Sequence, residues 1–221
     1  MRVVVPFDAV DPKTRLTPIL DTAERHAFAR CMLGDVLDAI CDAVTEATVD
    51  VLTTAPVDTG LEHGREVGVV VDDRPLSPAV NDIVTETVGT EALIVVMADL
   101  ALVTPEAVTR LVETAGDVVL APGRGVGTYA LVVRDPDFRV DFHGISFLDH
   151  SRAASAVGTV GTVDSFRLST DIDEADDLVE AFVHGGGRTT EWLRARFELV
   201  VDDEGGRVSL DRRCGDTGRE T

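Results

Sequence analysis

The sequence predicts a single α/β domain in which helices cover both faces of a mostly parallel sheet and antiparallel strands are added at one edge. Three observations lead to this class. The chain has 221 residues, which is the size of one ordinary domain. Hydrophobic residues make up 44% of it, enough for a sizeable core. Short β-branched runs alternate with longer amphipathic segments, which is the pattern of strands joined by right-handed helical crossovers.

The first half of the chain is expected to alternate strand and helix. Arg2–Phe7 has the composition of a buried strand, and the segment from Thr22 to about Ala47 has apolar residues at helical spacing. Asp21 and Glu24 form a capping-box pattern where that helix begins. The other elements of this half are strands at Val49–Thr53, Val67–Val71 and Leu93–Met97 and helices near 78–88 and 105–115. Both of these helices begin with a capping residue followed by proline.

The second half contains more strands, and they favour the antiparallel addition at one edge. The elements expected here are strands at Asp117–Ala121 and Tyr129–Val133, a helix at Ser146–Val157, an extended segment at Val160–Leu168, a helix at Glu174–His184, and a last pair of strands at Phe197–Val201 and Arg207–Leu210. We expect the domain to span residues 1–211 and a polar C-terminal tail to span 212–221.

The charge balance excludes some classes of partner. The chain has 20 basic and 40 acidic residues, a net charge of −20, and Lys13 is its only lysine. A strongly acidic composition with so little lysine is typical of proteins from a halophile. Binding to nucleic acid or to anionic membranes needs a basic face, so we expect neither. The apolar runs are too short for a signal peptide or a membrane span of roughly 18 residues, and we expect a cytoplasmic protein.

The loop after the first strand contains two cations, Lys13 and Arg15. A Lys-x-Arg pair in a loop is commonly just solvated. Here the only lysine of the chain stands at this position, and a compact ammonium beside a planar guanidinium suits a phosphate. We therefore favour phosphate binding at this loop.

Carboxylates follow two other predicted strands. Asp99 comes just after the apolar run that ends at Met97, where ligands gather in parallel sheets, although it could also cap a turn. Asp171 and Asp173 flank Ile172, and they share one face if this stretch is extended. Asp173 could instead cap the following helix. Carboxylates from separate strand ends facing a cationic loop predict a site for Mg²⁺ that bridges substrate phosphates.

A third group of candidates lies between these two. The glycine-rich segment 123–127 does not match a dinucleotide fingerprint, since it leads into a strand, but its amides and the Thr128 hydroxyl could approach an anion. Ser146 is expected at a helix N-terminus, which is either an anion site or a plain helix cap.

From Val4 to about Leu178 the chain resembles the 2-phospho-L-lactate guanylyltransferase family of coenzyme F(420) biosynthesis. Six of the family's motifs recur in order with similar spacing. They are Lys13-Thr14-Arg15-Leu16, Arg25 with Met32–Leu37, Asp99-Leu100-Ala101, Val126-Gly127-Thr128-Tyr129, Phe142–His150, and Asp171-Ile172-Asp173 with Asp177-Leu178. The chain departs from the family pattern where Ala101 replaces proline, His143 replaces glycine and Tyr129 replaces asparagine.

The resemblance implies a GT-A-like nucleotidyltransferase fold, a homodimer, and transfer of GMP from GTP to (2S)-2-phospholactate, or to phosphoenolpyruvate, with release of pyrophosphate. In that reaction Lys13 and Arg15 would stabilise the departing pyrophosphate. Asp99, Asp171 and, in support, Asp173 would hold Mg²⁺. The acceptor phosphate would be held by Thr128, by the backbone at His143 and by Ser146.

Two alternatives remain open from the residues alone. One is a nucleotidyltransferase with another phosphorylated acceptor. The other is a non-catalytic nucleotide-binding module, which would need the cations but not three carboxylates at strand ends. The preference for guanine is also open, because backbone groups in the loops around Thr53–Gly60 and Pro75–Asn81 could recognise a base.

Overall fold

The computed structural model describes residues 1–58, 66–201 and 206–213. Seven strands in this part form one sheet with the order β3-β2-β1-β4-β6-β5-β7. Their bounds are Arg2–Phe7 (β1), Thr48–Thr53 (β2), Gly68–Val71 (β3), Leu93–Val96 (β4), Val118–Pro122 (β5), Thr128–Val133 (β6) and Val160–Thr162 (β7). Four of the neighbouring pairs are parallel and two are antiparallel, so the expected mostly parallel α/β sheet is confirmed.

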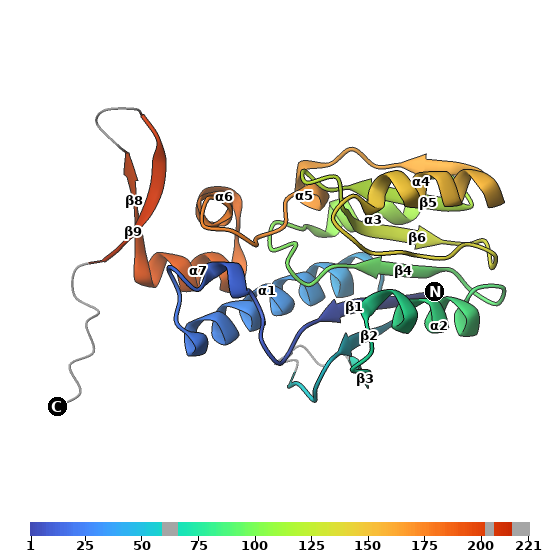
Figure 1. Cartoon of the computed structure of the whole chain (residues 1–221), viewed down its shortest axis with the longest axis horizontal. Helices are drawn as coiled ribbons and strands as arrows, with labels where there is room; N and C mark the ends of the chain where they lie inside the picture. The colour runs from blue at the N-terminus through green and yellow to red at the C-terminus, as the bar shows by residue number, and fades with distance from the viewer. Residues whose placement is uncertain (59–65, 202–205, 214–221) are drawn as a thin grey trace.

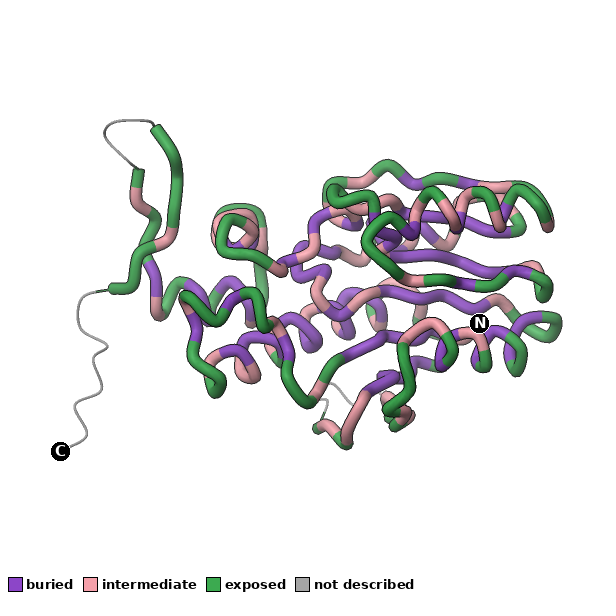
Figure 2. Tube along the Cα trace, in the orientation of Figure 1, coloured by how far each residue is buried: buried purple, intermediate pink, exposed green. Residues whose placement is uncertain are grey.

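Helices cover both faces of this sheet (Figure 1). They are α1 (Thr22–Ala43), α2 (Leu76–Thr87), α3 (Pro105–Glu113), α4 (Ser146–Val157), α5 (Phe166–Ser169), α6 (Asp177–His184) and α7 (Gly187–Arg196), together with a 3-10 turn at Thr14–Leu16. The apolar residues of α1, α3 and α7 share one core with one face of the sheet, and those of α2 and α4 share a second core with the other face. The buried segments follow the sheet and the inner sides of these helices in Figure 2. None of the described helices is long and apolar enough to cross a membrane.

The antiparallel strands do not add to the edge of the sheet as expected. β6 lies inside the sheet, antiparallel to both β4 and β5. The physical reason is the short glycine-rich connection between β5 and β6, which folds them into a hairpin and leaves β6 to pair with β4. The last two strands, β8 (Phe197–Val201) and β9 (Val208–Arg212), form a separate antiparallel pair that projects from the far end of the molecule in Figure 1.

Three of the element boundaries that differ from the sequence expectations are shifted by three residues or more. α1 ends at Ala43 rather than near Ala47, because residues from Thr48 onward are taken into β2, which pairs with β1. The segment expected to be extended to Leu168 contains only β7, and the helix α5 follows it. α6 begins at Asp177 rather than at Glu174, since the Asp177 carboxylate accepts bonds from the amides of Asp173 and Glu174.

The helix α7 was not expected at all. Its cap position is Gly186, which has no side chain to offer to the first amides. Asp35 of α1 supplies this cap although it is 153 and 154 residues away along the chain, as its two carboxylate oxygens accept from the amides of Arg188 and Thr189, each at 2.9 Å. A cap provided by another helix leaves no local pattern, and the sequence therefore does not predict this helix.

Arg212 and Arg213, at the start of the expected tail, contact the folded part of the chain. Arg212 is the last residue of β9 and pairs with Glu24 at the start of α1, and the Arg213 guanidinium donates to the Phe197 carbonyl at 2.9 Å. Residues 212 and 213, which the tail prediction included, therefore contact the folded part. The rest of the predicted tail, 214–221, lies outside the described residues.

Candidate functional site

The predicted cations and carboxylates meet at the carboxyl ends of β1 and β4. Lys13 and Arg15 lie in the turn after β1, Asp99 follows β4, and Asp171 and Asp173 lie in the extended stretch after α5. The amide of Ile172 donates to the Asp99 carbonyl at 3.1 Å, which ties the two carboxylate-bearing segments together. Five candidate residues from three separate parts of the chain thus form one cluster, as expected for an open α/β sheet.

Lys13 lies at the centre of this cluster and is not a solvated loop residue. Its Nζ donates to Asp99 Oδ2 at 2.8 Å and to Asp173 Oδ1 at 3.4 Å, and only 10% of its side chain is exposed. Burial lowers the pKa of its ammonium, but Asp99, Asp173 and Asp171 outweigh burial and raise that pKa above its ordinary value, so the group remains charged. Its backbone is left-handed, with φ 55° and ψ 44°. A non-glycine residue held in this sparsely populated region is a feature of functional sites.

Arg15 is the second cation of this cluster, and its partner is the carboxylate of Asp173. The Arg15 guanidinium pairs with Asp173 Oδ2, and the Arg15 side chain is 65% exposed. Both oxygens of Asp173 therefore have basic partners, Lys13 on one and Arg15 on the other. Asp173 does not cap the next helix with its side chain, so the capping alternative considered above does not apply.

The carboxylates of Asp99 and Asp171 are less fully compensated, although Asp99 Oδ2 accepts from Lys13. Asp99 Oδ1 is buried and has no hydrogen-bond partner. Burial, and next the negative charge of Asp99, raise the pKa of Asp171 to about 6. The Tyr129 phenol opposes this rise in the pKa of Asp171. A buried orphan oxygen next to a repelled carboxylate is an arrangement that a cation would relieve.

Within the described residues, no group of three or more His, Cys, Asp or Glu side chains is arranged to hold a metal ion by itself. The pair Asp99 and Asp171 nevertheless fits Mg²⁺, which is commonly bound by one or two carboxylates together with substrate phosphates and water. Asp173 fits less well, because its oxygens are already paired with Lys13 and Arg15.

The three acceptor-side candidates lie in a second group. The Thr128 amide donates to Ser146 Oγ at 3.1 Å, and Thr128 Oγ1 lies 2.8 Å from His150 Nδ1. The Asp141 amide donates to His150 Nε2 at 2.8 Å, so the neutral ring carries its proton on Nδ1 and donates it to Thr128. Burial lowers the pKa of His150 to about 4, which keeps the ring neutral. The hydroxyls of Thr128 and Ser146 are thus buried structural contacts.

His143 is the more accessible member of this group. Its side chain is 36% exposed, and its Nε2 lies 3.1 Å from Asp149 Oδ2. The first amides of α4 already have protein partners, since those of Ser146 and Phe147 donate to the carbonyls of His143 and Val126 at 3.0 and 3.1 Å. These two amides are therefore not available to bind an anion at the N-terminus of α4, where the sequence suggested an anion site.

Three of the five amides of the glycine-rich loop likewise donate to protein carbonyls. Those of Gly123 and Val126 donate within the loop, to the carbonyls of Gly127 and Gly123, and that of Arg124 donates to the Ser169 carbonyl at 2.9 Å. Sequence reasoning noted Tyr129 only as a departure from a family pattern and gave His150 no role. The available signal for Tyr129 was its place two residues after the last of three alternating glycines, as the only tyrosine of the chain.

Two neighbouring cavities lie at the carboxyl edge of β1. One, of about 230 Å³, is lined by Lys13, Asp99 and Asp173. The other, of about 240 Å³, is lined by Thr53, Thr54, Asp72, Arg74 and other residues at the ends of β2 and β3. Pro6, Phe7, Asp8 and Met97 line both cavities, so together they form one groove. Of the two loops considered for base recognition, residues 59 and 60 lie outside the described residues.

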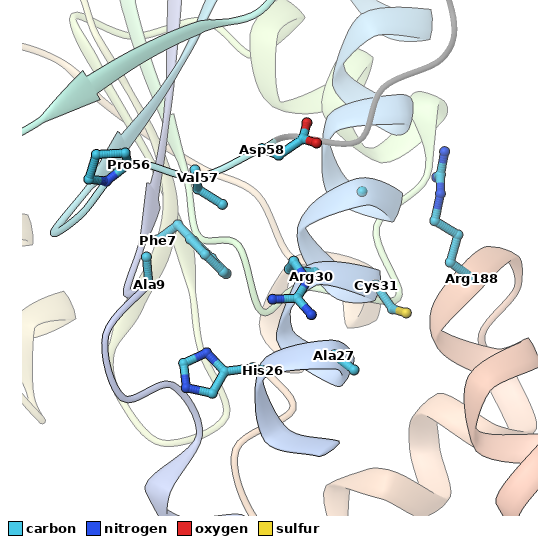
Figure 3. Close-up of a pocket in the computed structure, with 11 residues that line it drawn as sticks. Phe7, Ala9, His26, Ala27, Arg30, Cys31, Pro56, Val57, Asp58 and Arg188 are labelled. Atoms are coloured by element: carbon cyan, nitrogen blue, oxygen red, sulfur yellow. The ribbon is translucent and has the colours of Figure 1, made fainter. Parts of the chain in front are cut away.

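A third hollow, of about 560 Å³, lies on the other side of Phe7 and contains none of the predicted site residues. His26 and Arg30 of α1 face it from one side and Arg188 of α7 from another (Figure 3). The Arg188 guanidinium is already paired with Asp38. The predicted site residues Lys13, Asp99 and Asp173 therefore line the groove, and none of the predicted site residues lines this larger hollow.

Comparison with known proteins was made on this basis. A family model described as "Guanylyl transferase CofC like" matches residues 1–212. A protein of Halomicrobium mukohataei named 2-phospho-L-lactate guanylyltransferase is 53% identical over 214 residues, which cover 96% of this chain and 100% of that protein. A protein of the same name from Haloterrigena turkmenica is 53% identical over 228 residues, covering 96% of this chain and 97% of that protein.

Solved structures share the fold at low sequence identity. A putative nucleotide-diphospho-sugar transferase from Desulfovibrio desulfuricans has a TM-score of 0.63 and 17% identity, covering 88% of this chain and 94% of that chain. A nucleotidyl transferase from Methanothermobacter has a TM-score of 0.56 and 17% identity, covering 88% and 98%. These similarities support the expected nucleotidyltransferase fold.

Proposed function

The chain belongs to the family of CofC-like guanylyl transferases, and we propose that it transfers GMP from GTP to (2S)-2-phospholactate or phosphoenolpyruvate. With phospholactate the products are lactyl-diphosphoguanosine and pyrophosphate, a step of coenzyme F(420) biosynthesis. The observation that carries this proposal is the cluster in which the buried Lys13 ammonium faces Asp99 and Asp171 at the ends of β1 and β4.

The reaction needs no nucleophilic side chain. An oxygen of the acceptor phosphate attacks the α-phosphorus of GTP and forms the new P–O bond, while the bond from that phosphorus to the pyrophosphate oxygen breaks. Both reactants are anions, so the protein must align them and compensate the charge that develops on the leaving group. The groove contains both signs of charge required for this task.

We propose that Asp99 and Asp171 hold Mg²⁺. The buried unpaired Asp99 Oδ1 and the repulsion between the two carboxylates support this role. Magnesium would supply charge compensation between the α-phosphate and the acceptor phosphate. Asp173 has a different role in this proposal: it pairs with Lys13 and Arg15 and keeps both cations directed at the groove.

Lys13 and Arg15 are proposed to stabilise the departing pyrophosphate. A buried ammonium is desolvated before the reaction begins, so it gains more from a developing negative charge than an ammonium in water would. The exposed Arg15 guanidinium can exchange its bond to Asp173 for a bidentate contact with a phosphate. The nucleoside would extend along the groove toward the ends of β2 and β3.

We propose that Thr128, His143 and Ser146 form the site of the acceptor phosphate, and that their roles differ. Thr128 and Ser146 are buried and tie β6 to α4, which supports a role in shaping this side of the site. His143 is partly exposed and is the member of the group that can contact a bound anion.

The remaining proposals concern the whole protein. We propose a homodimer, supported by the exposed apolar side chains of the β8–β9 pair, Leu199, Val201 and Val208, because two strands alone bury too little to be stable. We also propose a cytoplasmic, halophilic protein, consistent with the net charge of −20 and with GTP as a substrate.

Pyrophosphate release tests the proposed function. The four nucleoside triphosphates are each combined with phospholactate, with phosphoenolpyruvate, with a sugar phosphate and with no acceptor. Release with GTP that depends on phospholactate or phosphoenolpyruvate is the expected result. Release only with a sugar phosphate would assign another acceptor, and no release in any combination would indicate a non-catalytic nucleotide-binding module.

A further inference from the structure

Arg25 is a charged residue on the buried side of α1. Only 7% of its side chain is exposed, and the other buried residues of this helix are apolar or glycine. Burying a guanidinium is costly unless hydrogen-bond acceptors meet it. Its Nε is buried and has no hydrogen-bond partner among the described residues. The contacts of its two terminal nitrogens must therefore explain its position.

The Arg25 guanidinium reaches the loop that follows β1. Its Nη1 donates to the Pro12 carbonyl at 2.6 Å and to Asp11 Oδ1 at 2.8 Å, and its Nη2 lies 3.5 Å from Thr22 Oγ1. The Asp11 side chain is 60% exposed, whereas the bond to the Pro12 carbonyl is buried. A buried carbonyl that loses its donor has no water to replace it. The bond to Pro12 is therefore the contact on which the loop depends most.

The Pro12 carbonyl belongs to the peptide that joins Pro12 to Lys13. Lys13 has a left-handed backbone, with φ 55° and ψ 44°, which is uncommon for a residue other than glycine. The peptide on its other side is held as well, since the Leu16 amide donates to the Lys13 carbonyl at 2.9 Å. Such a conformation persists only where the surroundings hold it from several sides. Arg25 provides one of these sides.

The left-handed backbone determines where the Lys13 side chain points. Its ammonium donates to Asp99 Oδ2 at 2.8 Å and to Asp173 Oδ1 at 3.4 Å. A change to extended backbone would turn the Cα–Cβ bond of Lys13 and carry the ammonium away from these oxygens. We propose that Arg25 is a positioning residue that fixes the Pro12–Lys13 peptide and so keeps the ammonium between the two carboxylates. Its consequence for catalysis rests on the proposed function.

The variant Arg25→Met tests this role, because methionine is apolar and has no donor for the Pro12 carbonyl. We expect kcat to fall roughly tenfold to a hundredfold, as for a displaced catalytic group, with little change in KM for GTP. Arg25→Lys keeps a charged donor at this place and should recover part of the lost kcat. Arg30→Met, which removes an exposed arginine from the same helix, is the matched control and should keep wild-type kcat.

A double variant separates positioning from a general structural role. If Arg25 acts through Lys13, adding Arg25→Met to Lys13→Ala lowers kcat no further than Lys13→Ala alone. Full additive losses in the double variant would overturn the proposal. So would wild-type kcat in Arg25→Met, whatever its melting temperature, because that is the result expected of a purely structural arginine.

A further readout is independent of activity. Lys13 is the only lysine of the chain, so ¹⁵N-lysine labelling gives one backbone amide resonance, from the peptide that Arg25 contacts. A strong intraresidue NOE between its HN and Hα is the signature of a positive φ. We expect this NOE in the wild type and in Arg30→Met, and a weaker NOE with a shifted resonance in folded Arg25→Met.

Two outcomes of this measurement overturn the proposal. One is a folded Arg25→Met in which the resonance and the NOE are unchanged. The other is a wild type without the strong NOE, a result that decides even if Arg25→Met does not fold. If the wild type transfers no guanylyl group, the proposed function fails, and the NOE still decides whether Arg25 holds the backbone of Lys13.

Discussion

At the scale of single residues, Lys13 combines burial, a left-handed backbone and two carboxylate partners. We expect Lys13→Ala and Lys13→Arg both to lose turnover. Loss of one charge-assisted contact to the leaving group costs about 2–4 kcal/mol of transition-state stabilisation, or about 10²–10³ in rate. The arginine variant is not rescued by its charge, because a wide guanidinium does not fit where one ammonium lies between Asp99 and Asp173.

Steady-state kinetics check this prediction. The contact strengthens as pyrophosphate departs, so the loss should fall mainly on kcat and less on KM for GTP. Arg110→Ala removes an exposed cation on α3 and serves as the control. Wild-type kcat in Lys13→Ala would remove the assignment, and full activity in Lys13→Arg would reduce it to a requirement for positive charge.

His150 gives a second prediction at this scale, concerning stability and pH. Its folded-state pKa of about 4 lies below its ordinary value of 6.5, with burial the main cause and with Asp141, His143 and Asp149 as the charged neighbours. Between these two values the unfolded state binds a proton that the folded state does not. The stability from this group is therefore full above pH 6.5 and falls by about 3 kcal/mol as the pH drops to 4.

The measurement is the free energy of unfolding from urea titrations across this pH range, for the wild type and for His150→Gln. The difference between wild type and variant isolates the histidine from other titrating groups. It should decrease toward low pH by about this amount. A difference that does not change between pH 7 and pH 4 would contradict the buried neutral imidazole.

At the scale of elements, the cap that Asp35 provides to α7 is a contact between helices that can be removed by one substitution. We expect Asp35→Ala to lower the free energy of unfolding by about 1–2 kcal/mol, the cost of losing a helix cap. Asp38→Ala, which removes the ion pair with the Arg188 side chain and leaves the cap from Asp35 in place, should cost about 0–1 kcal/mol. Hydrogen exchange of the first α7 amides should accelerate in Asp35→Ala alone, and equal protection in both variants would be evidence against the cap.

Elements with a local pattern were predictable from the sequence, and elements fixed by distant contacts were not. The capping box at Asp21 and Glu24 correctly marks the start of α1, and Pro105 correctly marks α3. The helix α7 depends on Asp35, and the position of β6 inside the sheet depends on its pairing with β4. Neither contact has a sequence signature.

The same distinction holds for the site. Lys13, Asp99 and Asp171 each follow a predicted or observed element end, and the general rule for open α/β sheets brings such residues together. The ion pairs of Asp173 and the place of the Tyr129 phenol beside the carboxylates could not be predicted, because both depend on how three distant loops approach one another. Similarly, the hydroxyls of Thr128 and Ser146 turn inward onto each other's segments, which only the packing of α4 on β6 determines.

At the scale of the whole molecule, we expect the net charge of −20 to make the stability of the fold depend on salt. Repulsion among exposed carboxylates reaches further as ionic strength falls, with a Debye length of about 10 Å at 0.1 M. We expect the thermal midpoint to rise steeply between about 0.1 M and molar KCl. A midpoint independent of KCl over this range would contradict the halophilic interpretation of the composition.

The central claim is that the protein transfers the guanylyl group of GTP to an acceptor phosphate, and that Asp99 and Asp171, facing Lys13, are required for this transfer. It is tested most directly by following α-³²P from GTP into product in the presence of phospholactate and Mg²⁺, for the wild type and for Asp99→Asn. The account predicts one labelled lactyl-diphosphoguanosine for each pyrophosphate released by the wild type, and almost no transfer by a folded Asp99→Asn even at high Mg²⁺. Transfer by Asp99→Asn at the wild-type rate, or release of pyrophosphate without labelled product, would contradict it.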